Sequence, residues 1–113
     1  MSIDELGDHV WGELSPRRHA AGRGIVARLV RRVVLEFPKP SLANASPSTI
    51  DFVMHEMSRS IAADERKNCG MGIILSLLLG ALIQEIVKAV FRWWMQSASN
   101  QALVLGWQTE MKR

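Results

Sequence analysis

The most constraining feature of this sequence is a run of sixteen residues, from Cys69 to Gln84, that contains no charged side chain. Isoleucine and leucine crowd the middle of the run, so a helix here is apolar on most of its sides. Such a helix is stable only when other helices, subunits or lipid cover several of those sides. The sequence therefore predicts a long interaction helix over residues 70–97, and it indicates no chemical reaction.

Small and polar residues recur at every fourth position of this helix. Residues four apart lie on one ridge of a helix, so these positions form a single line, small at its start and polar at its end. Small residues at this spacing let two helix backbones approach closely. We expect a close helix–helix contact along this line, called here the packing seam: Gly72, Ser76, Gly80 and Gln84.

Two environments are compatible with the long apolar helix. Sixteen uncharged residues extend only about 24 Å, which is short of a hydrocarbon core of roughly 30 Å. A longer span would include Glu85 and Lys88, and it would place Trp93 and Trp94 as interfacial aromatics at the membrane surface. The alternative is a helix buried in protein, packed against a neighbouring copy or another subunit. The sequence leaves both open.

Start and stop signals predict three shorter amphipathic helices before the long one. The signals are a capping box of Ser2 and Glu5, and serines before proline at Ser15 and Ser46. Ser48, with Asp51 three residues later, is a second candidate cap for the third helix. Pro38 ends the second helix, because residues before proline are displaced from the helical region. We expect these helices at residues 2–14, 16–37 and 46–66.

The expected fold class is all-α: three short amphipathic helices followed by one long apolar helix. The arrangement is extended or bundle-like, and oligomer or assembly contacts complete it. The run Ser97–Asn100 predicts a break, after which the chain forms at most a short turn of helix. The expected division is an amphipathic region with a basic second helix at 1–68, an interaction or membrane helix at 69–97, and a short tail at 98–113.

Charge is segregated along the chain. Residues 1–15 carry four acids and no Lys or Arg, whereas residues 16–40 hold six Arg and one Lys against one Glu. The acidic start predicts no secretory signal, and localisation otherwise stays open. The basic segment has three interpretations: a face that is solvated or paired within the protein, a contact with anionic lipid, or a contact with nucleic acid. The candidate residues, called here the arginine face, are Arg17, Arg18, Arg28, Arg31 and Arg32.

No constellation for catalysis or metal binding is found in the sequence. The three histidines and the single cysteine lack the paired spacing of metal ligands, and no Ser/His/Asp set can be assembled. We therefore expect a non-enzymatic protein without a cofactor or a bound metal.

The leading hypothesis is a structural subunit of a larger assembly, such as a virion, a membrane complex or a homo-oligomer. Its partners would be copies of itself or other subunits. An alternative is a small membrane-active or membrane-anchored protein that resembles a holin or a viral pore in its action. A third is a helical module that binds nucleic acid.

Overall fold

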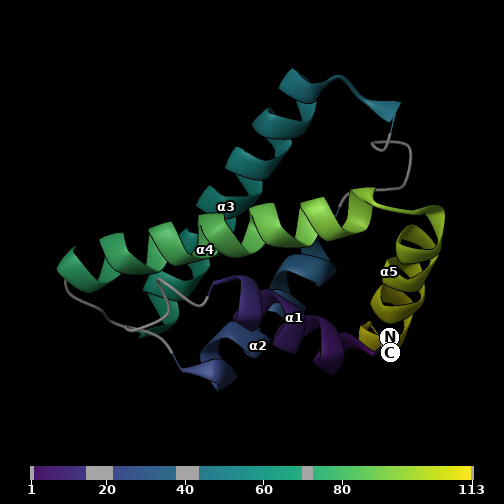
Figure 1. The fold of residues 1–113 in the computed structure, drawn as a ribbon. Helices are drawn as coiled ribbons and strands as arrows, with labels where there is room; N and C mark the ends of the chain where they lie inside the picture. The colour runs from purple at the N-terminus through teal and green to yellow at the C-terminus, as the bar shows by residue number, and fades with distance from the viewer. Residues whose placement is uncertain (1, 15–21, 38–43, 70–72, 113) are drawn as a thin grey trace.

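The computed structural model describes residues 2–14, 22–37, 44–69 and 73–112. These residues form five helices and no strand, which confirms the all-α prediction (Figure 1). The prediction of three short helices and one long helix is incomplete, because the third and fourth helices both have 23 residues. The helices are α1 (Ile3–Glu13), α2 (Arg23–Glu36), α3 (Pro47–Cys69), α4 (Ile73–Met95) and α5 (Ala98–Met111).

The first helix, α1, begins at the cap that its sequence predicts. Ser2 Oγ accepts a hydrogen bond from the backbone N–H of Glu5 at 3.2 Å. Leu6 and Val10 are fully buried, and Gly7 between them lies against Ala27 of α2. A Cβ added at Gly7 would lie 3.5 Å from the Ala27 Cα, an ordinary van der Waals distance, so α1 and α2 lie in contact at this point.

The second helix, α2, buries the apolar side that its periodicity indicates. Val26, Leu29, Val30, Val33 and Val34 are buried, whereas Ile25 is 43% exposed. The described part of the helix begins at Arg23, and the predicted start at residue 16 lies outside the described residues.

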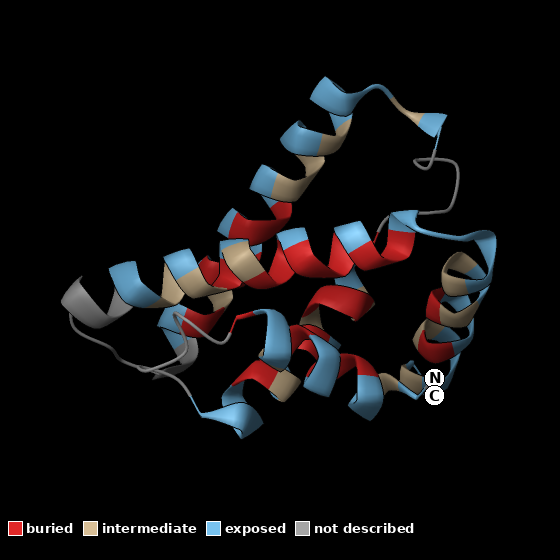
Figure 2. Cartoon of the chain, viewed as in Figure 1, coloured by how far each residue is buried: buried red, intermediate tan, exposed pale blue. Residues whose placement is uncertain are grey.

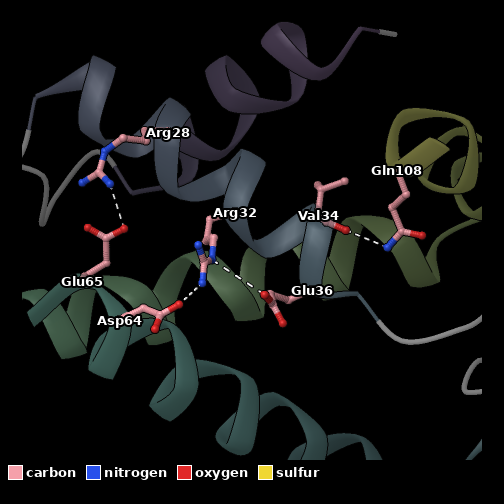
Figure 3. Close-up of polar contacts among 7 residues, drawn as sticks. All are labelled: Arg28, Arg32, Val34, Glu36, Asp64, Glu65 and Gln108. Atoms are coloured by element: carbon pink, nitrogen blue, oxygen red, sulfur yellow. Dashed lines mark hydrogen bonds and ion pairs between the residues drawn. The ribbon is translucent and has the colours of Figure 1, made fainter. Parts of the chain in front are cut away.

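The C-terminal end of α2 is held by a side chain from α5. Gln108 Nε2 donates to the Val34 carbonyl oxygen at 2.7 Å (Figure 3). It also donates to the Phe37 carbonyl oxygen at 3.1 Å. The last carbonyls of a helix have no partner within the helix itself. The Val34 carbonyl also accepts from the Phe37 N–H at 3.2 Å, so Gln108 adds a second hydrogen bond there and a further one to the Phe37 carbonyl.

The third helix, α3, has two unlike halves. Ser46 caps its start, accepting from the Thr49 N–H at 3.3 Å, and this confirms the predicted cap. The half nearer the N-terminus projects from the rest of the molecule, and much of its surface is exposed (Figures 1 and 2). The other half buries Met57, Ile61 and Ala62 in the core.

The fourth helix, α4, contacts each of the other four helices. Its buried side includes Ile83, Ile86, Val87, Val90 and Trp94, which lie in one continuous core with residues of the other helices. Its N-terminal end projects from the body in a different direction from the projecting half of α3 (Figure 1). α4 is thus both the centre of the core and one of the two projecting arms.

The C-terminal segment is a helix of 14 residues, so the prediction of a short tail with at most one turn is wrong. The Ser97–Asn100 run is a cap as well as a break, because Ser97 Oγ accepts from the Asn100 N–H at 3.3 Å. Asn100 Nδ2 also donates to the Trp93 carbonyl oxygen at 2.7 Å and so fixes the turn from α4 into α5. Val104 and Trp107 of α5 are buried against the core.

Candidate interaction surface

The candidate functional feature is one exposed side of α4, called here the solvent face. Leu77 is 71% exposed and Leu78 is 52% exposed, although they belong to the most apolar stretch of the chain. Residues three or four apart on a helix share one side, and the exposed positions follow this spacing from residue 77 to residue 95. They are Leu77, Leu78, Ala81, Gln84, Lys88, Arg92 and Met95.

The solvent face changes character along its length. The exposed side chains at its N-terminal end are leucine and alanine, and Met95 at its C-terminal end is 41% exposed. Between these ends lie Lys88 and Arg92, and neither makes an ion pair with any described residue. The face is therefore apolar at both ends and basic toward its middle.

The structure describes the surroundings of only two members of the packing seam, Gly80 and Gln84. Gly72 lies outside the described residues, and Ser76 is helical with a side chain that is not described. Gly80 is half-buried, but a Cβ added to it would meet no atom within 4 Å, and Gln84 is exposed. A close contact of Gly80 and Gln84 with another chain stays a prediction.

A groove lies beside the solvent face where α3 passes α4. It has a volume of about 290 Å³, and both helices supply its lining. Ser58, the buried member, donates its hydroxyl to the Met54 carbonyl oxygen at 2.8 Å. The lining residues are Asp51, Met54, His55 and Ser58 from α3, with Gln84 and Lys88 from α4.

Three members of the arginine face pair with carboxylates of the same chain. Arg28 Nη1 lies 2.7 Å from Glu65 Oε1, and Arg31 Nη2 lies 2.8 Å from Asp4 Oδ1. Arg32 pairs with Asp64 through Nη2, and its Nε lies 3.8 Å from Glu36 Oε1 (Figure 3).

These ion pairs link α2 to α1 and to α3, so they agree with the interpretation of a face paired within the protein. Arg17 and Arg18 lie outside the described residues. Whether an anionic partner also contacts Arg28, Arg31 or Arg32 stays a prediction. The sequence could not supply this pairing, because Arg28 and Glu65 are 37 residues apart.

The predicted interfacial aromatics, Trp93 and Trp94, lie in the core of this structure at 5% and 1% exposure. Trp93 stacks on Trp107 with ring centroids 5.7 Å apart and an interplanar angle of 8°. Trp94 meets Phe37 and Phe91 edge-on, at centroid distances of 5.2 and 5.8 Å. Both rings therefore hold helices of this chain together.

The described residues contain neither a candidate membrane span nor a candidate metal cluster. None of their helices combines the length and the apolar character needed to cross a membrane. No group of three or more His, Cys, Asp or Glu side chains among them is placed to hold a metal ion.

Comparison of the chain with protein-family models, with curated proteins and with solved structures finds no match.

Proposed function

We propose that this protein is a non-enzymatic structural subunit that takes its place in a larger assembly through the solvent face of α4. The observation that carries the proposal is the exposure of Leu77 and Leu78, at 71% and 52%. Large apolar side chains that are adjacent and exposed are characteristic of surfaces that bind another protein or a membrane. The partners in this proposal are copies of the chain or other subunits.

Burial of Leu77 and Leu78 would stabilise a complex formed at the solvent face of α4. Burying a leucine side chain that was exposed to water stabilises a complex by roughly 1.5–3 kcal/mol. A charged partner surface would lose hydration against Leu77 and Leu78, so an apolar partner surface is favoured there. Ala81, on the same side of the helix, leaves room for a partner to approach the backbone.

The test is the size of the species that contains the chain in extracts of its native source. The tagged wild-type chain is expected to elute well above the size of the purified monomer. The double substitution Leu77→Gln and Leu78→Gln should return it to the monomer position. Leu105→Gln is a matched control, because Leu105 is a 43% exposed leucine on a different helix, α5.

Two results would overturn the proposal: a wild-type chain that elutes as a free monomer in the extract, or a large species that survives the double substitution. Running the extracts with and without detergent adds a further readout. A large species that requires detergent to remain in solution points to lipid as the partner, which is the alternative hypothesis.

A further inference from the structure

We propose that the groove between α3 and α4 binds a small zwitterion, a molecule with one ammonium and one carboxylate group, such as an amino acid. The ammonium group pairs with Asp51 of α3 and the carboxylate pairs with Lys88 of α4, and both residues line the groove. This site goes beyond the proposed function, which depends on the exposed leucines Leu77 and Leu78.

The groove lies where α3 and α4 separate from each other. The two helices are in contact, and the C-terminal half of α3 buries Met57 and Ile61 in the core. The N-terminal half, which includes Asp51 and His55, projects from the molecule (Figures 1 and 2). Each helix therefore supplies one wall, and the space between the walls is about 290 Å³.

The exposed polar side chains of the two walls do not pair with one another. Asp51 and His55 on α3, and Gln84 and Lys88 on α4, make no side-chain hydrogen bond or ion pair with any described residue. By contrast, every charged side chain in the described part of α2 lies in an ion pair. The groove thus holds a negative charge on one wall and a positive charge on the other, and each is available to a ligand.

The other lining residues suit the same ligand. Ser58 is buried and donates its hydroxyl to the Met54 carbonyl oxygen at 2.8 Å, so the hydroxyl oxygen can still accept from an ammonium group. The Gln84 amide can donate to a carboxylate, and the flexible Met54 side chain offers an apolar surface to methylene groups. Each end of the zwitterion therefore has one charged partner and one neutral partner: Asp51 with Ser58, and Lys88 with Gln84.

The size and the exposure of the groove set the kind of ligand and the strength of binding. Ligand pockets have volumes of about 300–1,000 Å³, so a groove of about 290 Å³ accepts a ligand of amino-acid size. Asp51 and Lys88 are exposed, and water weakens ion pairs at exposed sites. The expected dissociation constant is therefore in the millimolar range, and both charges of the ligand are needed to reach it.

A titration followed by NMR tests the site with defined probes. The probes β-alanine, γ-aminobutyrate and ε-aminocaproate differ only in the distance between their two charges. At least one of them should shift the amide signals of residues 51–58 and 84–88 and saturate in the millimolar range. Butyrate and butylammonium, which carry one charge each, should produce no saturable shift at the same concentration and ionic strength.

Substitutions in the two walls test which residue binds which charge. Asp51→Asn and Lys88→Gln should each weaken binding of the tightest zwitterion by about three- to tenfold, because each removes one charge-assisted contact. The matched controls are Glu110→Gln in α5 and Lys112→Gln at its end, which neutralise exposed side chains away from the groove. Both controls should bind like the wild-type chain, and all four variants should keep their helical circular dichroism.

Three results would overturn the zwitterion site. They are the absence of a saturable shift with all three zwitterions, equal binding of butyrate or butylammonium, and binding that survives both substitutions in the walls. The proposed function is tested separately, because the species in the native extract depends on Leu77 and Leu78, which do not line the groove.

Discussion

Arg28 of α2 donates a hydrogen bond to the buried carboxylate of Glu65 in α3, and no other described residue does so. The Nη1–Oε1 distance is 2.7 Å, and the Glu65 side chain is only 7% exposed. The other oxygen of Glu65, Oε2, has no hydrogen-bond partner among the described residues. The Arg28–Glu65 contact therefore decides whether a charge on α3 is compensated where α3 meets α2.

Replacing Arg28 by Met should destabilise the protein more than an ordinary surface substitution does. The change leaves a buried carboxylate with no donor, which costs about 1–3 kcal/mol. The lower part of that range is expected, because Arg28 itself is 55% exposed and water can partly replace it. Urea unfolding followed by circular dichroism measures the difference.

The control for this change is Arg23→Met. Arg23 also pairs with an acid of another helix, Asp8 at 3.6 Å, but both side chains are more than 60% exposed. Exposed pairs contribute about 0–1 kcal/mol, so this substitution should have little effect. Equal losses for the two variants would show that burial of Glu65 has no energetic consequence.

The contact of Gln108 with the end of α2 predicts which of two substitutions at position 108 destabilises the protein more. Gln108→Met removes both hydrogen bonds to the carbonyls of Val34 and Phe37, which should cost about 1–2 kcal/mol. Gln108→Glu should cost more, because it brings a negative charge to the negative end of the helix dipole. Unfolding free energies that rank the Glu variant above the Met variant would contradict this account of the contact.

The stacking of Trp107 on Trp93 should be the main attachment of α5. Trp107 is 9% exposed, and replacing a buried tryptophan by alanine typically costs about 3–5 kcal/mol. We expect Trp107→Ala to unfold at lower urea concentration and to exchange its α5 amide hydrogens faster than those of α2. The exposed Leu105 of the same helix is the control, and Leu105→Ala should change neither measurement. Slow exchange of the α5 amides in Trp107→Ala would show that other contacts hold the helix.

The cap of α1 and the apolar sides of α1 and α2 could be predicted from the sequence, because they depend on residues a few positions apart. The exposed side of α4 could not be predicted in the same way. Leu77 and Ile83 look alike in an uncharged apolar run, and only the packing of the other helices makes one exposed and the other fully buried. The same limit applies to α5, whose attachment depends on Trp93, a residue of the preceding helix.

The pairing of the arginine face shows the limit for charges. A helix with Arg28, Arg31 and Arg32 on one side has the same sequence whether its partner is water, lipid, nucleic acid or the chain itself. Asp4, Asp64 and Glu65 become partners only when α1 and α3 pack beside α2. Local patterns therefore identify charged surfaces, whereas the partners of those surfaces follow from the tertiary structure.

Substitutions of Gly80 separate the stability of the monomer from its association. A Cβ at Gly80 meets no atom within 4 Å, and glycine inside a helix costs about 1 kcal/mol relative to alanine. Gly80→Ala should therefore stabilise the dilute monomer by up to about 1 kcal/mol in urea unfolding. Gly106→Ala is the matched control, because Gly106 lies inside α5 and its added Cβ also meets no atom within 4 Å.

A larger side chain at Gly80 should weaken association, whereas the same change at Gly106 should not. Gly80→Ile places a branched side chain where the packing seam would meet a second helix, and overpacking of a contact typically costs about 1–3 kcal/mol. The variant should keep its helical circular dichroism while the associated fraction falls, whereas Gly106→Ile should leave that fraction unchanged. Normal association with isoleucine at position 80 would show that no helix approaches this part of α4 closely, and the glycine would then have no role in packing.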